Sequence, residues 1–197
     1  MQEILNKTFF IEYDCLANGA KQVDIHQFVA AVDLLANASR IASSGCGHSG
    51  IACRHFAHLM CCIERPARFI SPSDAVHGAT GYLQEDDVVV LVSRGGKTSE
   101  LIPILEISNK KNVKIILLTE NKESILAEKA DVVLQIYVTE ETDKFNSQGT
   151  TSFTATCVIF HALQAALIEK IDFKLDNFAQ IHPGGAVGER LNNKTDI

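Results

Sequence analysis

The chain alternates between two patterns of apolar residues. Short continuous apolar runs, of which residues 88–92 (VVVLV) form the clearest, are typical of strands buried on both faces of a parallel sheet. Longer segments between them carry apolar residues three or four positions apart, which is the spacing of one helix face. We therefore expect strands at about 40–43, 68–70, 88–92, 113–118 and 131–137, and helices at about 49–63, 98–111, 124–129 and 150–171, after one or two opening helices.

This alternation of strands and helices predicts an α/β fold. Strands joined through helices pair in parallel through right-handed crossovers, and the helices then cover both faces of the sheet. Neither a repeat nor a linker-like stretch interrupts the sequence, so we expect a single domain over residues 1–197. In such folds the ligand lies at the carboxyl ends of the strands.

Composition narrows the range of partners. The formal net charge is -6, whereas nucleic acids and anionic membranes require clustered Lys and Arg, so neither is expected as a partner. No apolar run approaches the roughly 20 residues that span a bilayer, and the first residues lack the basic and apolar regions of a targeting signal. We expect a cytoplasmic protein that binds small molecules or copies of itself, with its six cysteines as reduced thiols.

Two turns rich in glycine and serine stand out, at residues 45–50 (GCGHSG) and 93–98 (SRGGKT). Each lies between an expected strand and an expected helix. Glycine lets the backbone turn tightly and approach a ligand, and the free N–H groups at the start of a helix attract an anion. With the hydroxyls of Ser49, Ser93 and Thr98 as further donors, the two turns are predicted to form the two halves of one phosphate site.

Two nucleotide-binding motifs fit these turns poorly. Glycines at 45, 47 and 50 match Gly-x-Gly-x-x-Gly, but a dinucleotide site also needs an acidic residue about 20 positions on, where the chain has Ile70 and Ser71. Residues 96–98 (GKT) end like a P-loop, yet Leu91 occupies the position of its first glycine. Neither dinucleotide binding nor nucleotide hydrolysis is predicted.

Metal and thiol chemistry is not predicted either. His55, His58 and Cys62 share one face of an expected helix, but no carboxylate stands at a recognisable spacing, so packing or surface roles are favoured. Cys46 lies in the first turn, where a helix N-terminus and His48 would lower its thiol pKa, but no other residue indicates a nucleophilic cysteine. Small buried apolar roles are expected for the remaining helix cysteines, which are Cys53, Cys61, Cys62 and Cys157.

Six segments together resemble the sugar isomerase (SIS) domain and, more narrowly, the arabinose 5-phosphate isomerases. Besides the two turns they are residues 74–78 (DAVHG), Glu141, residues 150–152 (TTS) and residues 182–188 (HPGGAVG), of which the last is the most specific. The resemblance covers about residues 41–191. It implies a three-layer α-β-α sandwich around a five-stranded parallel sheet and a phosphosugar ligand. It also implies homodimers or homotetramers in which neighbouring subunits help to complete each site.

The resemblance also assigns site residues. Ser49, Ser93 and Thr98 fall where the family holds phosphate, while His77, Glu141 and His182 match its active-site positions. The candidate catalytic residues are therefore Glu141, His182, His77 and Lys97, and the candidate substrate-binding residues are Gly47, His48, Ser49, Ser93, Arg94, Gly95, Thr98 and Thr151.

The chain departs from the isomerase pattern in both turns. His48 stands where these isomerases usually carry Lys, and Arg94, Gly95 and Lys97 replace their usual Asn, Ser and Glu. Two ionisable positions of the active site have therefore changed character. From residues 1–197 we expect no counterpart of the paired CBS domains that commonly follow the last segment in these isomerases.

An aldose–ketose interconversion can run on the retained residues, so neither a metal nor a cofactor is expected. A base removes the proton beside the carbonyl, and a proton returns to the neighbouring carbon of the enediolate. Glu141 is the candidate base, and His182 and His77 are candidates for moving hydroxyl protons or opening the sugar ring. Lys97 or Arg94 would offset enediolate charge or hold phosphate. We therefore predict a phosphosugar isomerase that acts on a pentose phosphate such as arabinose 5-phosphate.

Other interpretations stay open. A non-catalytic phosphosugar-binding module would keep the turns without the chemistry, as His48 and Lys97 suggest. A 6-phospho-3-hexuloisomerase is similar in fold and length, but the ending at residues 182–185 (HPGG) favours the arabinose 5-phosphate type. Glu141 lies in an acidic stretch that would ordinarily be solvated surface, and His182 and His77 could simply close a turn or end a helix.

Overall fold

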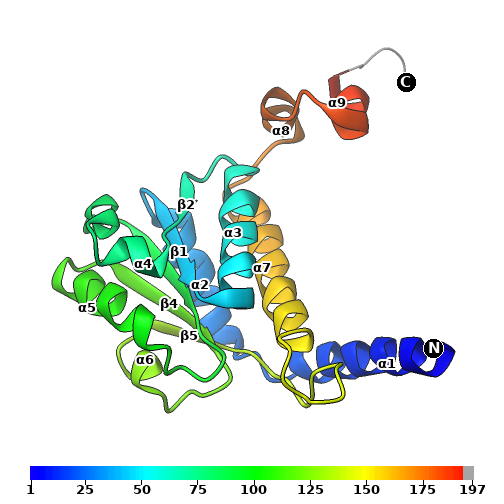
Figure 1. Cartoon of the computed structure of the whole chain (residues 1–197). Coiled ribbons are helices and arrows are strands. Elements are labelled where there is room, and N and C mark those ends of the chain that lie inside the picture. Colours follow the sequence, from blue (N-terminus) through cyan, green and yellow to red (C-terminus); the bar gives the residue numbers. More distant parts are fainter. Residues whose placement is uncertain (193–197) are drawn as a thin grey trace.

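The computed structural model describes residues 1–192 and contains a five-stranded, all-parallel sheet with the strand order β2-β1-β3-β4-β5. The strands are β1 (Ile41–Gly45), β2 (Ala67–Phe69), β3 (Val88–Val92), β4 (Lys114–Thr119) and β5 (Val132–Gln135). Helices lie on both faces of this sheet (Figure 1). The predicted α/β architecture, a three-layer sandwich around five parallel strands, is confirmed.

Most crossovers between the strands are helical, as the apolar spacing predicts. The α-helices are α1 (Gln2–Gly19), α2 (Ile25–Asn37), α3 (Gly47–Cys61), α4 (Pro72–Ala75), α5 (Ile102–Lys110), α6 (Ile125–Glu128), α7 (Thr151–Lys170), α8 (Leu175–Ile181) and α9 (Gly185–Asn192). Two short 3-10 helices, η1 (Ala79–Tyr82) and η2 (Ser99–Leu101), complete the described elements.

Alternate residues of the central strands pack into two separate apolar cores, one on each face of the sheet. In β3, Val88, Val90 and Val92 pack with α2, α3 and α7 on one face of the sheet. Val89 and Leu91 pack with α5 and α6 on the other. All five residues of β3 are buried because helices cover both faces, which is why this strand reads as a continuous apolar run.

The observed bounds of some helices and strands differ from the predicted ones. Strand β3 matches its prediction, but β1 continues through Ser44 to Gly45, into the turn. The helix expected from residue 98 is wrong in its first part, because the 3-10 helix η2 comes before α5. Helices α8 and α9 were not anticipated. The prediction of a single domain over residues 1–197 stays a prediction, and residues 193–197 lie outside the described part of the chain.

Helix α7 corrects one sequence-based expectation. By length and composition alone α7 could cross a membrane, so the prediction that no apolar run approaches the length of a membrane span is wrong. In the structure α7 packs against α1, α2 and α3, and Phe160, Leu163 and Leu167 are fully buried. This packing accounts for the apolar residues on the inner face of α7, which are part of an apolar window that is 39% buried.

Candidate functional site

The two predicted turns lie side by side at the carboxyl edge of the sheet. The strand order reverses direction between β1 and β3, because β2 lies beyond β1 while β4 and β5 lie beyond β3. Gly45 pairs in register with Val92, so the first turn and the second turn leave neighbouring strands at the same level. A reversal of this kind opens a crevice that is the usual ligand site of doubly wound sheets.

The first turn leads directly into the N-terminus of α3. Gly47 begins the helix with φ 54°, a left-handed conformation that favours glycine, and no side chain caps the helix at Cys46. A Cβ on Gly50 would lie 2.6 Å from the Gly45 carbonyl oxygen, so close packing of the turn requires glycine there. The unshared N–H groups of the first helical turn, including those of His48 and Ser49, are therefore available to an anion.

The second turn has a different structure. Gly96 has φ 66°, and a Cβ there would lie 1.9 Å from the Ser124 hydroxyl oxygen. Ser93 is buried, and its hydroxyl is 2.7 Å from that of Thr98, so these two predicted phosphate donors are hydrogen-bonded to each other. Gly95 is exposed beside them. Thr98 is the N-cap of the short 3-10 helix η2, which runs into α5, so this turn leads into a 3-10 helix and not directly into an α-helix as the first turn does.

Glu141 is not solvated surface. The residue is 1% exposed, although it lies in an acidic stretch. The Arg94 guanidinium (Nη1) donates to Glu141 Oε1 at 2.5 Å, and the Thr150 hydroxyl and the Ser152 backbone N–H donate to Oε2 at 3.0 and 3.2 Å. Burial alone would raise the pKa of Glu141, but the hydrogen bonds from Ser152 and Thr150 and the Arg94 charge outweigh burial and lower that pKa. Glu141 is therefore an ionised carboxylate at neutral pH.

Two further carboxylates surround this ion pair, and the sequence analysis missed both. Glu120 accepts a 2.8 Å hydrogen bond from Arg94 Nε. It directly follows β4, so the rule that ligand sites lie at carboxyl strand ends could have pointed to it. Glu12 comes from α1, and burial and the nearby charge of Glu141 raise the pKa of Glu12. Its Oε2 atom and the hydroxyl oxygen of the fully buried Thr151 have no partner at full hydrogen-bond geometry within residues 1–192, although the Thr154 and Thr151 hydroxyls are near enough to oppose the rise of the Glu12 pKa.

A small cavity joins the first turn to the ion pair. His48, Ser49, Arg94 and Ser152 all line it, and its volume of about 20 Å³ suits roughly one water molecule. A wider, more open depression of about 370 Å³ lies on the other side of the turn, lined by residues that include Gly47, Arg54, Ser71 and Glu100. The structure thus brings the predicted anion site together with the predicted base, in a closed arrangement.

The structure separates His182 from Glu141 within the chain, and His77 and Lys97 do not bond to Glu141 in the described residues. Glu141 contacts the start of α7, whereas His182 follows α8, beyond the far end of α7 (Figure 1). A helix of 20 residues is about 30 Å long, which separates the two ends. His182 packs instead against Phe178, with ring centroids 5.0 Å apart. His77 and Lys97 are both exposed.

Two expectations about cysteine are wrong. Burial and the charge of Glu100 raise the pKa of the Cys46 thiol, where a lowered pKa was considered. Cys61 is exposed, although it was expected to be buried with Cys53 and Cys157. All six cysteines are free thiols in the described residues, and their reduced state in solution stays a prediction.

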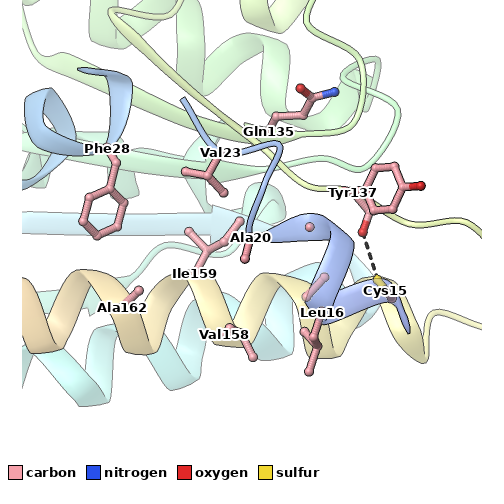
Figure 2. A pocket seen from close by; sticks show the side chains of 12 residues that line it. Cys15, Leu16, Ala20, Val23, Phe28, Gln135, Tyr137, Val158, Ile159 and Ala162 are labelled. Atoms are coloured by element: carbon pink, nitrogen blue, oxygen red, sulfur yellow. Dashed lines mark hydrogen bonds between the residues drawn. The ribbon is translucent and has the colours of Figure 1, made fainter. Parts of the chain in front are cut away.

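An apolar cavity of about 220 Å³ lies away from the two turns, between α1, α2, β5 and α7 (Figure 2). Leu16, Phe28 and Ile159 are among the residues around it, and the Cys15 thiol donates to the Tyr137 carbonyl oxygen at 2.9 Å. With no Lys, Arg or His among the described residues that line it, this cavity does not fit a phosphorylated ligand.

The fold and the crevice define a doubly wound α/β protein with a glycine-rich turn and a helix N-terminus at the switch point of its sheet. The SIS domain model matches residues 34–166, and the chain belongs to this family. The family resemblance stated above is thereby confirmed.

Characterised relatives are similar along most of the chain. Arabinose 5-phosphate isomerase KpsF of Escherichia coli is 35% identical over 177 residues, which cover 89% of this chain and 56% of that protein. Arabinose 5-phosphate isomerase KdsD of Pseudomonas aeruginosa is 37% identical over 170 residues, covering 86% and 52%. The chain thus spans little more than half the length of these relatives.

Solved structures agree with the fold. A Listeria monocytogenes protein described as a candidate sugar-phosphate isomerase is 34% identical, with a TM-score of 0.90 and coverage of 93% of this chain and 96% of that one. A protein of Escherichia coli CFT073 in complex with arabinose 5-phosphate is 27% identical, with a TM-score of 0.86 and coverage of 92% and 96%.

Proposed function

We propose that this chain is a phosphosugar aldose–ketose isomerase that acts on a pentose phosphate such as arabinose 5-phosphate. One observation carries the proposal most directly: His48 and Ser49 of the anion-binding turn share a cavity with Arg94 and Ser152, which both bond to the buried carboxylate of Glu141. A phosphate site and a base are thus adjacent. The names of the relatives, and the sugar phosphate bound to a structural neighbour, point to the same substrate class.

The proposed roles follow from this geometry. The phosphate binds the free N–H groups at the start of α3, with help from the Ser49 hydroxyl. Glu141 then removes the proton from the carbon beside the sugar carbonyl, and the carboxylic acid so formed returns a proton to the neighbouring carbon of the enediolate.

Arg94 connects phosphate binding to the activation of Glu141. Its side chain is 39% exposed while it bonds to Glu141, so an incoming phosphate or enediolate can attract it. When Arg94 turns towards that anion, Glu141 loses a positive partner and becomes a stronger base. Binding of the phosphate and activation of the base are coupled in this way.

A second subunit supplies His182 in this proposal. His182 lies at the far end of α7 from Glu141, so it reaches a Glu141 only in another copy of the chain. The projecting part of α1 exposes Phe9 and Phe10 at 70% and 66%, which suits a homodimer or homotetramer. Mixing inactive Glu141→Gln subunits with inactive His182→Asn subunits tests this directly. Partial recovery of turnover supports a shared site, and its absence with proven subunit exchange opposes one.

The experiment that tests the proposed function measures ketose phosphate formation from a panel of pentose and hexose phosphates. Glu141→Gln is expected to lower kcat by about 100-fold or more, the usual cost of losing a general base. Glu140→Gln is the matched control, because Glu140 is the exposed neighbour in the same acidic stretch. If Glu141→Gln turns over its substrate at the wild-type rate, Glu141 is not the base.

A specific observation favours a second candidate, a non-catalytic phosphosugar-binding module. Both oxygens of Glu141 already accept hydrogen bonds, and Lys97 replaces the acidic residue usual in the related isomerases. A module of this kind would bind a sugar phosphate through the first turn, and it would interconvert none of the panel.

A further inference from the structure

Two histidines from different helices meet on the surface of the domain. His55 of α3 and His161 of α7 place their Nε2 atoms 3.0 Å apart, with their ring planes at 89°. His161 is exposed and His55 is half-buried, so solvent reaches the pair. The sequence could not reveal this pairing, because 106 positions separate the two residues.

The core holds the pair in place. Phe56 and Phe160, the chain neighbours of the two histidines, stack with ring centroids 4.4 Å apart and are fully buried. Because each histidine is adjacent to one of these packed residues, the two helix backbones are held at a fixed separation at the points where the imidazoles leave them. A pre-positioned pair of ligands loses little conformational entropy on binding.

The two Nε2 atoms are hydrogen-bonded to each other, and their separation is also close to that of two ligands on one metal ion. Nitrogen atoms at about 2.0–2.1 Å from a tetrahedral ion stand about 3.3–3.4 Å apart, and those in neighbouring square-planar positions stand about 2.9 Å apart. Metal binding uses the neutral imidazole, whose free nitrogen lone pair becomes the ligand.

We propose that His55 and His161 bind a divalent transition-metal ion that accepts imidazole, such as Ni²⁺ or Zn²⁺. Within residues 1–192 no three His, Cys, Asp or Glu side chains converge on a point, so water completes the coordination. The ion joins α3, which begins at the anion-binding turn, to α7, which begins beside Glu141. This inference does not rest on the proposed function.

A rival pair lies further along α3. The His58 Nε2 atom is 3.6 Å from the Cys62 sulfur, one helical turn apart. A thiolate would attract a softer ion, whereas Ni²⁺ suits imidazole ligands. Ni²⁺ is therefore the better probe, and variants of each pair separate the two sites.

The test is calorimetric titration of the untagged, reduced full chain with Ni²⁺ at about pH 7.5, where imidazole is mostly neutral. Substitution His55→Ala or His161→Ala is expected to weaken binding at least about tenfold, a loss of roughly 1.4 kcal/mol. His26→Ala is the control, because His26 is an exposed histidine on α2, and it should bind like the wild type.

Thermal unfolding provides a second readout. Ni²⁺ should raise the unfolding temperature of the wild type and of His26→Ala, and it should leave both pair variants unchanged, because a ligand stabilises only a protein that binds it. The proposal is overturned if Ni²⁺ does not bind, if the pair variants bind as tightly as the wild type, or if Cys62→Ser abolishes binding while they retain it.

Discussion

Replacing Arg94 by Met tests the electrostatics of the candidate site most sharply. Glu141 has no exposed side-chain surface, and Arg94 is the cation that bonds to it. Exposed ion pairs contribute about 0–1 kcal/mol, whereas leaving a buried charge without its partner costs about 3–5 kcal/mol. Since Arg94 is itself 39% exposed, its pair lies between these limits, and we expect a loss of about 2 kcal/mol near neutral pH.

The pH dependence of this loss has a definite sign. The pKa of Glu141 is lowered in the folded protein, so its contribution to stability is present above the unfolded pKa and disappears as pH falls through the folded one. Without Arg94 the folded pKa rises. The difference in stability between Arg94→Met and the wild type is therefore expected to narrow as the pH falls into the acid range and Glu141 of the variant becomes protonated before that of the wild type.

Urea unfolding at one fixed protein concentration measures both effects. With a slope of about 2 kcal/mol per molar urea, the expected loss lowers the midpoint near neutral pH by about 1 M. The double variant Arg94→Met, Glu141→Gln should recover most of it, since no buried charge is left unpaired. A midpoint shift below about 0.25 M near neutral pH, or the same shift at about pH 4, would refute this reasoning.

Three further predictions concern other parts of the fold. Gly50→Ala should lower the free energy of unfolding by about 1–3 kcal/mol in thermal unfolding, because its Cβ would lie 2.6 Å from a carbonyl oxygen. Gly81→Ala is the control and should leave the stability nearly unchanged, because open space surrounds Gly81. Burial raises the pKa of Glu12, so ionisation of this residue destabilises the folded protein as the pH rises. Glu12→Gln should therefore be more stable than the wild type near neutral pH. Equal stability of both proteins from about pH 4 to 8 would contradict this. Phe56→Ala should cost about 3–5 kcal/mol in urea unfolding, since the ring is fully buried and stacked; a loss under about 1 kcal/mol would contradict the packing described.

The fold could be predicted from the sequence because its signals are local. The run of β3 is apolar throughout because helices cover both its faces, and the two glycine turns follow neighbouring strands. The 3-10 helix η2 was not predicted because its residues also fit the start of a longer α-helix. The last two helices have few buried side chains, so they lack the apolar spacing that marks a helix packed on the core.

Less of the candidate site than of the fold could be predicted from the sequence. Glu140 and Glu141 are neighbours of the same type, yet one is exposed and the other buried, because Arg94 and Thr150 reach only Glu141. Family resemblance, and not charge pattern, singled out Glu141. The same resemblance named His182 but could not say that the length of α7 separates it from Glu141 within one subunit. Glu12 gave no signal, because only tertiary packing brings α1 to α7.

The measurement that tests the central claim most directly is proton NMR of arabinose 5-phosphate with the purified protein in deuterated water. The account predicts that deuterium enters at the carbon beside the carbonyl and that a ketose phosphate appears, with both processes at least about 100-fold slower in Glu141→Gln. Ligand-induced shifts without exchange, for this sugar and for every other pentose and hexose phosphate tried, would contradict the isomerase and leave a phosphosugar-binding module.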